Sequence, residues 1–244
     1  MIFQKRVKEI MEDIYNRGKI PILVGGTGFY IQAVLNDIAF TKEKQGDEIR
    51  ADLQNLAKEK GASYLHHELQ KVDKESAEAI HPNNIKRVIR ALEYFQSTGQ
   101  KFSDHNKEER QKGSPYNFLY LVLTMNRKVL YERIDKRVDQ MMEEGLVKEV
   151  KQLLNAGYSR NLVSMQGLGY KEIASALFKE CTMEEAVYRL KRDTRHFAKR
   201  QMTWFRRERD VTMINKDNFS NNHEIVNYIM KLAVEKGICS CREG

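Results

Sequence analysis

A glycine-rich bend near the start of the chain carries residues that can hold a ligand. Gly25, Gly26 and Gly28 surround Thr27, directly after the apolar run 20–24. Glycine lets the backbone approach a ligand closely, and Thr27 places a hydroxyl at the carboxyl end of the expected strand. Open α/β sheets bind ligands at that edge, so the bend is a candidate site. A tight turn between a strand and a helix, with no ligand, is the alternative that these residues leave open.

Two arginines further along the chain are spaced for a shared anion. Arg133 and Arg137 lie one turn apart on one face of a helix expected at 127–144. Leu130 and Ile134 lie on another face, which we assign to the core. Two guanidiniums so spaced can both reach a diphosphate with a bidentate geometry that lysine cannot supply. A solvated basic face is the alternative.

Basic residues also gather on two other expected helices. Lys86, Arg87 and Arg90 share one arc of a helix at 84–98. A long helix at 182–208 is expected to place basic and apolar residues on opposite faces, with Arg192, Arg195, Lys199 and Arg206 against Val187, Leu190, Phe197, Ala198 and Phe205. Such a helix can pack on a domain while it follows phosphates. For Trp204, we favour core packing over stacking on a base.

The elements that must position these residues form an α/β pattern. A helix at 5–17 and a buried parallel strand at 20–24 precede the bend, and a helix near 28–36 follows it. Residues 48–112 are almost wholly helical in pattern, although the charged stretch 103–114 predicts an exposed connection. The other expected elements are strands at 118–124 and 211–215 and helices at 127–144, 146–156, 170–178, 182–208 and 222–236.

Composition describes a globular protein that favours a polyanionic partner. The 244 residues are 41% hydrophobic and 31% charged, with a net charge of +8. No apolar run approaches the roughly 18 residues that a membrane helix needs. Cys181, Cys239 and Cys241 form no disulfide framework and fit a reducing cytoplasm. The six histidines have no metal-ligand spacing, and Cys239 and Cys241 have no partner pair nearby, so no metal site is predicted from these residues.

Five separated blocks of the chain together resemble one enzyme family. The blocks are GGTGFYIQAVL (25–35), HPNNIKRVIRALE (81–93), RKVLYERIDKRVDQMMEEGLVKEV (127–150), SMQGLGYKEI (164–173) and TRHFAKRQMTWFR (194–206). In this order they resemble the tRNA dimethylallyltransferases, also called tRNA isopentenyltransferases. The resemblance implies a P-loop-NTPase-like α/β core with an all-helical insert. The implied domains are core at 1–40, a tRNA-binding insert at 41–116, and core with lid-like and basic helices at 117–244.

The resemblance also implies a reaction and its partners. These enzymes transfer a dimethylallyl group from dimethylallyl diphosphate to the exocyclic amine of the adenosine 3′ of the anticodon, with Mg²⁺. Thr27 is the implied catalytic residue, which orients and hydrogen-bonds and does not abstract the proton. Gly25, Gly26, Arg133 and Arg137 are the implied diphosphate ligands. We expect a cytoplasmic monomer with no membrane partner.

Contact with tRNA is implied for a larger set of residues. The set is Thr27, Arg50, Lys86, Arg87, Val88, Ile89, Arg90, Gln166, Gly167, Leu168, Gly169, Tyr170, Lys171, Lys199, Arg200, Gln201, Met202, Thr203, Trp204, Phe205 and Arg206. Gln166 and Lys171 stand where the family often has arginine, which weakens the case for bidentate contacts there. Tyr170 can stack on an exposed base.

One family feature does not occur in the sequence. The family carries a phosphate-binding G-x-x-x-x-G-K-[ST] loop and a D-S-x-Q-like segment with the catalytic aspartate ahead of the glycine bend, and neither is found in the 244 residues. The core is therefore expected to lack its first strands. We expect this chain to be inactive or nearly so, because a phosphate cradle and a base each contribute on the order of several kcal/mol. A nucleotide-kinase-like phosphotransferase and a non-catalytic tRNA-binding fragment are the alternatives.

Overall fold

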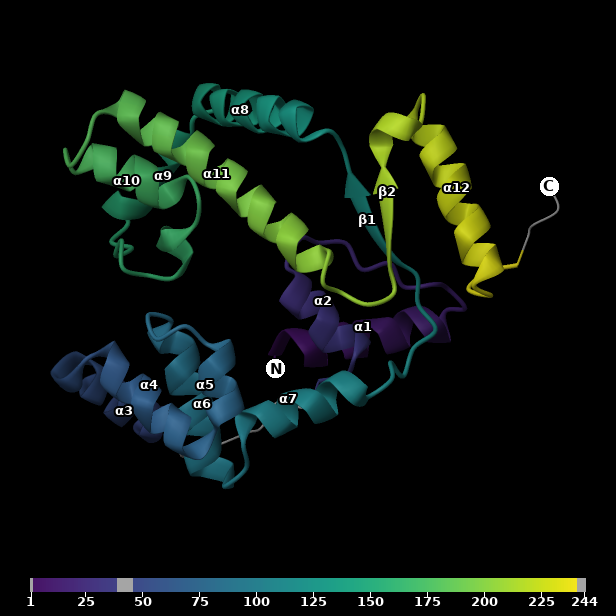
Figure 1. Ribbon diagram of the computed structural model, residues 1–244. Helices are drawn as coiled ribbons and strands as arrows, with labels where there is room; N and C mark the ends of the chain where they lie inside the picture. The colour runs from purple at the N-terminus through teal and green to yellow at the C-terminus, as the bar shows by residue number, and fades with distance from the viewer. Residues whose placement is uncertain (1, 39–45, 241–244) are drawn as a thin grey trace. The chain divides into compact units, whose positions relative to one another are not determined.

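The computed structural model describes residues 2–38 and 46–240, and these form two compact units. One unit comprises Met1–Leu23 and Phe29–Tyr116, and the other comprises Val24–Gly28 and Asn117–Gly244. Helices dominate the described residues, and a small parallel sheet lies in the second unit (Figure 1). The expected boundary at 40/41 lies outside the described residues. No described helix is both long enough and apolar enough to span a bilayer.

The first unit contains a bundle of short helices. They are α3 (Gly46–Lys60), α4 (Ala62–Val72), α5 (Lys74–Ala79), α6 (Ile85–Thr98) and α7 (Phe102–Gln111). Leu65, Leu69 and Val88 are fully buried where α3, α4 and α6 pack together. Gly99 ends α6 in a left-handed conformation, with φ of 71°, which a residue with a side chain rarely adopts.

Most of the described residues in 103–114 are exposed, as expected, but the stretch is not an irregular connection, because α7 occupies Phe102–Gln111. Phe102 packs against the bundle core, and the Tyr94 ring lies 5.6 Å from its ring. The Ser103 backbone N–H donates to the buried Asp73 carboxylate at 2.8 Å. Burial by itself raises the pKa of Asp73, but hydrogen bonds from Ser76 and Ser103 outweigh it and lower that pKa. The charged composition of 103–114 did not predict the contacts that hold α7 on the bundle.

Two more helices of the chain lie on either side of the glycine bend. They are α1 (Ile2–Asn16) and α2 (Gly28–Leu35). Gln4 joins them, since its Nε2 donates to the Ala33 carbonyl at 2.8 Å. Phe3 stacks on Tyr30 at 4.7 Å.

The buried strand expected at 20–24 is also wrong. The chain there has no regular secondary structure, and the exposed fractions of Ile22 and Val24 are 83% and 88%. A strand requires a neighbouring strand for its backbone hydrogen bonds. Within the described residues the only sheet joins β1 (Tyr120–Thr124) to β2 (Val211–Asn215).

The two strands of the second unit pair in parallel, with Tyr120 opposite Val211 and Thr124 opposite Asn215. Tyr120, Val122 and Ile214 are buried, whereas Leu123 and Met213 are largely exposed. Val122 pairs with Met213 and Leu123 pairs with Ile214, and paired residues point to the same side of a sheet. The buried residues of β1 and of β2 therefore lie on opposite faces. Together with the surrounding helices, this parallel sheet confirms the α/β class.

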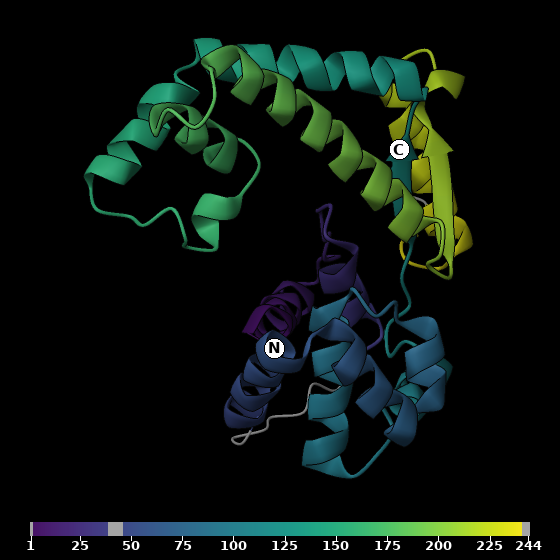
Figure 2. The same cartoon turned by 60° about the vertical axis from the view of Figure 1, so that its left-hand side comes forward.

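Helices of the second unit pack around a core of their own. They are α8 (Arg127–Glu143), α9 (Leu146–Asn155), α10 (Tyr170–Leu177), α11 (Met183–Phe205) and α12 (Asn222–Glu235), of which α8 to α11 surround Val138, Val150, Ile173 and Leu190. Thr182 caps α11, since its hydroxyl accepts from the Glu185 N–H at 3.1 Å. Figures 1 and 2 show α8 and α11 running side by side, and the two helices are in contact.

Candidate functional site

The glycine bend is held by the carboxyl-terminal end of α11. The Gln201 Nε2 donates to the Gly26 carbonyl at 2.9 Å. A Cβ added to Gly26 would overlap the Gln201 amide, and one added to Gly28 would overlap the Trp204 indole. Only glycine fits at these two positions without displacing the helix side chains. The structure thus brings together the bend around Thr27 and the expected tRNA-contacting stretch of α11.

Thr27 itself is exposed, so its hydroxyl is accessible to a ligand. Gly25 has open space around its Cα, because an added Cβ would meet no atom within 4 Å. The Trp204 ring lies against Gly28, and its Nε1 is buried without a hydrogen-bond partner among the described residues. This contact agrees with the packing role expected for Trp204.

Arg133 and Arg137 project from α8 and are exposed. Arg137 lies 3.6 Å from the Glu144 carboxylate, and Arg133 lies 3.9 Å from the Met125 sulfur. Leu130 and Ile134 are half-buried, as their assignment to another face predicts. A shared diphosphate between these arginines and Thr27 stays a prediction, because the two cavities described below are lined by other residues.

The basic face expected on α11 is only partly free. The Arg195 guanidinium binds both oxygens of Asp135 on α8, at 2.6 and 2.7 Å. Packing of α8 beside α11 thus gives Arg195 a carboxylate partner, and its side chain is only 25% exposed, so we do not expect it to contact a phosphate. Phe197 was expected on the apolar face but is 42% exposed, and the Arg200 guanidinium lies 5.8 Å from its ring. Lys199 and Arg206 are exposed, as expected.

A second basic site lies on the helical bundle. Arg50 on α3 donates from Nε and Nη2 to the Glu93 carboxylate at 2.9 to 3.1 Å, and Arg90 donates to it at 3.3 Å. Glu93 is 2% exposed, so its carboxylate fixes both guanidiniums from inside. Sequence reasoning missed Glu93. Its spacing of three residues after Arg90 was the available signal.

These arginines line a cavity of about 560 Å³ between α3 and α6. Its floor includes Ala57 and Ile89, and Lys58 and Lys86 lie at its edge. Val88 and Ile89 belong to the expected tRNA-binding range, but their side chains are buried in the bundle core. The side chains of α6 that solvent or RNA can reach in this range are therefore the basic ones, Lys86, Arg87 and Arg90.

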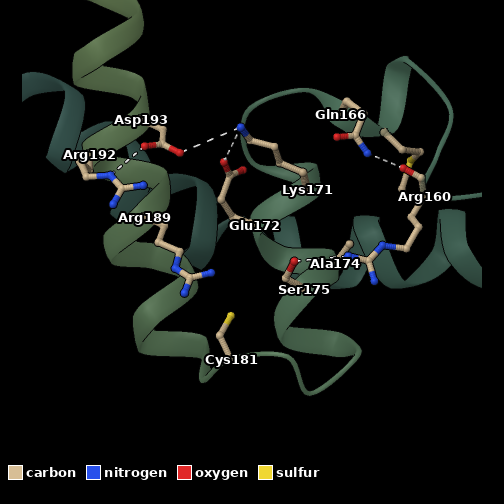
Figure 3. Close-up of a pocket in the computed structure, with 11 residues that line it drawn as sticks. Arg160, Gln166, Lys171, Glu172, Ala174, Ser175, Cys181, Arg189, Arg192 and Asp193 are labelled. Atoms are coloured by element: carbon tan, nitrogen blue, oxygen red, sulfur yellow. Dashed lines mark hydrogen bonds and ion pairs between the residues drawn. The ribbon is translucent and has the colours of Figure 1, made fainter. Parts of the chain in front are cut away.

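The expected contact range 166–171 leads into α10, beside a cavity of about 460 Å³ (Figure 3). Gln166 Nε2 donates to the Arg160 carbonyl at 2.7 Å. Gly169 has a φ of 99°, which favours glycine at the start of α10. The Tyr170 hydroxyl donates to Glu149, and this hydrogen bond, followed by burial, raises the pKa of Tyr170.

Comparison with known proteins defines the class to which this arrangement belongs. The family model described as IPP transferase matches residues 1–208. The tRNA dimethylallyltransferase of Lachnoclostridium phytofermentans is 55% identical over 97% of this chain and 75% of its own length. That of Acetivibrio thermocellus is 47% identical over 92% of this chain and 72% of its own length. The chain belongs to the IPP transferase family.

Solved structures agree with this assignment. The tRNA isopentenylpyrophosphate transferase of Bacillus halodurans has a TM-score of 0.65 and 41% identity, over 96% of this chain and 74% of that one. A eukaryotic dimethylallyltransferase acting on tRNA has a TM-score of 0.75 and 28% identity, over 94% of this chain and 61% of that one. The structural likeness therefore extends over nearly the whole of the present chain.

Proposed function

We propose that this protein transfers a dimethylallyl group from dimethylallyl diphosphate to the exocyclic amine of the adenosine 3′ of the anticodon in tRNA. Relatives named for this reaction share up to 55% of their residues with it over nearly its whole length. The contact between Gln201 and the Gly26 carbonyl is the observation that carries the proposal. This hydrogen bond connects the glycine bend, which can bind a small charged substrate, with the carboxyl-terminal end of α11, whose exposed basic residues can bind RNA.

The proposed chemistry is a substitution at carbon. The adenosine amine forms a bond to the first carbon of the dimethylallyl group, while the carbon–oxygen bond to diphosphate breaks. The electron pair of that bond leaves with diphosphate, and the amine loses its proton to water. Charge develops on the leaving oxygens, so donors aimed at them accelerate the reaction.

Residues of this chain are assigned to those donors. The Gly25 and Gly26 backbone and the Arg133 and Arg137 guanidiniums are proposed to bind the diphosphate, and Thr27 to orient the amine. Mg²⁺ is the expected counterion of such a leaving group. Among the described residues, however, no three His, Cys, Asp or Glu side chains are grouped to hold a metal. The described side chains alone do not fit a magnesium site, so no step is derived through the metal.

The RNA is assigned to the exposed basic residues of both units. Arg50, Lys86, Arg87 and Arg90 are proposed to meet phosphates on the helical bundle. The range 199–206 is proposed to meet the anticodon loop, except for Trp204, which packs on Gly28, and Phe205, which is buried. The segment 166–171 is proposed to contact unpaired nucleotides. The net charge of +8 supports binding to a polyanion.

The test is label transfer from dimethylallyl diphosphate to an unmodified anticodon stem-loop, with protein in excess so that even slow transfer is measured. The same RNA with inosine at the target position, which lacks the exocyclic amine, is the control. We expect label only in the adenosine RNA, and loss of most of it with Thr27→Val. ATP hydrolysis without RNA would instead indicate a phosphotransferase. Salt-sensitive RNA binding without any label would indicate a binding fragment.

A further inference from the structure

Basic and acidic side chains both line the cavity between α10, α11 and the segment before α10 (Figure 3). Its volume of about 460 Å³ falls in the usual range for small-molecule pockets. Arg189 and Arg192 reach into it from α11, and Arg160 lies on the opposite side. Glu172 stands between them on α10.

Glu172 is a buried acceptor, and one of its oxygens has an ion-pair partner but no hydrogen bond among the described residues. The residue is 5% exposed, and its Oε2 accepts from the Gly169 N–H at 2.9 Å. Oε1 is buried and accepts no hydrogen bond from the described residues, although Lys171 Nζ lies 3.3 Å away as an ion-pair partner without hydrogen-bond geometry. A buried carboxylate oxygen without a donor is costly, so a ligand that supplies N–H groups here is stabilised.

The two arginines on α11 keep donors for an anion. Within the described part of the chain, Arg189 pairs with Glu185 through Nη2 and Arg192 bonds Asp193 through Nε. Each guanidinium has further N–H groups. The two residues are three positions apart and therefore lie on the same face of α11. Both side chains are about half exposed, so a phosphate can reach them from solvent.

These features select the chemistry of the ligand. A free cation is disfavoured by Arg160, Lys171, Arg189 and Arg192, so the N–H groups that meet Glu172 must come from a neutral group. The ligand also needs an anionic group for the arginines. Unpaired nucleotides combine a phosphate with a neutral base edge. Among the four bases, guanine alone presents two adjacent N–H donors on that edge, and a carboxylate accepts both.

We propose that this cavity binds one guanine nucleotide, with the base edge on the Glu172 carboxylate and the phosphate on Arg189 and Arg192. The nucleotide can be free or part of a single-stranded RNA. In the second case the cavity extends the RNA surface of the proposed function, because Gln166 and Lys171 belong to both. The proposal does not depend on prenyl transfer.

Titration with mononucleotides tests the base selectivity. Isothermal calorimetry at low salt measures GMP, AMP and IMP against the intact chain. We expect GMP to bind about tenfold more tightly than AMP, as one good bidentate contact provides. IMP lacks the 2-amino group and should lie between them. Equal affinity for GMP and AMP, or no binding of either at millimolar concentration, would overturn the proposal.

Two substitutions separate the base contact from the phosphate contact. Glu172→Gln keeps the size of the side chain and should remove the preference for GMP, whereas Glu184→Gln, the same change at an exposed site on α11, should leave it intact. Arg192→Ala should weaken GMP and AMP equally and should not alter their ratio. If Glu172→Gln does not fold, the titration of Arg192→Ala with GMP still tests the proposed site. An unchanged GMP affinity in that variant contradicts the assigned phosphate contact.

A competition experiment distinguishes the two sources of the nucleotide. A uridine heptamer with one central guanosine is compared with the same heptamer carrying adenosine. Tighter binding of the guanosine heptamer than of GMP, with displacement of GMP, indicates RNA as the source. Tighter binding of GMP than of the heptamer indicates a free nucleotide. Both readouts are binding constants, so failure of the prenyl-transfer assay does not affect them.

Discussion

The helical bundle α3–α7 is rich in charged residues and buries its apolar side chains, whereas the wholly apolar segment 20–24 leaves most of its side chains exposed. Leu65 and Leu69 in the bundle are fully buried, whereas Ile22 and Val24 are almost fully exposed. The bundle helices satisfy their backbone hydrogen bonds internally and find apolar partners in neighbouring helices. The segment needs a strand beside it, and among the described residues none pairs with it. An apolar pattern therefore leads to burial only where its partner is present.

The largest expected effect contrasts these two regions directly. Leu69→Ala should lower the free energy of unfolding by about 2 to 5 kcal/mol, because it leaves a cavity in the bundle core. Ile22→Ala should change it by less than about 0.5 kcal/mol, because that side chain is already in solvent. Urea denaturation followed by circular dichroism measures both. Similar losses of unfolding free energy in the two variants would contradict the claim that Leu69 is buried and Ile22 is exposed.

A second prediction concerns how the bend that follows the exposed segment is held. Gly28→Ala should cost about 1 to 3 kcal/mol, because its Cβ would overlap the Trp204 ring. Trp204 is the only tryptophan, so its fluorescence reports the displacement as a red shift and faster quenching by acrylamide. Gly113→Ala is the matched control, since a Cβ there meets no atom within 4 Å. An unchanged spectrum in Gly28→Ala would show that the bend does not rest on α11.

The buried side chain of Tyr120 on β1 gives a third prediction, with a smaller effect. The Tyr120 hydroxyl is buried without a hydrogen-bond partner among the described residues, so Tyr120→Phe should stabilise the protein by about 1 kcal/mol. Burial, followed by the charge of Glu208, raises the pKa of Tyr120 to about 12 from an ordinary value of 10.0. The unfolded phenol ionises first, so stability should fall as the pH rises from 10 to 12.

Denaturation of wild type and Tyr120→Phe across that pH range isolates this residue. The advantage of the variant should grow between pH 10 and pH 12, because only the wild type loses stability through this phenol. A constant difference across the range would mean that the Tyr120 hydroxyl is solvated in the folded protein.

The smallest expected effect compares two cations of α11 that look alike in sequence. Lys199→Ala should reduce the slope of log affinity against log salt for an anticodon stem-loop by about one, as loss of one phosphate contact does. Arg195→Ala should leave that slope unchanged, because its guanidinium is already bound to Asp135. If both variants reduce this slope equally, Arg195 contacts a phosphate in spite of its ion pair with Asp135.

The sequence predicts the helices well because periodic apolar residues, caps and glycine stops are local signals. The strands at 120–124 and 211–215 were also predictable, since both are rich in strand-forming residues. Contacts between residues distant in the sequence were not predictable, and this explains the errors at 20–24 and at Phe102–Gln111. It also explains why the pairing of Arg195 with Asp135 was missed. The same limit hid Glu93, whose role depends on Arg50 across the bundle. It also hid the pocket around Glu172, which only the packing of α10 against α11 creates.

The most direct test of the central claim is nucleoside analysis of an RNA product. The protein is incubated with an unmodified anticodon stem-loop, dimethylallyl diphosphate and ATP together, and the digested RNA is examined by mass spectrometry. With the protein in excess over the RNA, we predict a low yield of adenosine carrying one dimethylallyl group, derived only from the position 3′ of the anticodon, while ATP stays intact. The low yield follows from the near-inactivity expected from the sequence. Unmodified adenosine together with accumulating ADP would contradict the assignment as a tRNA prenyltransferase.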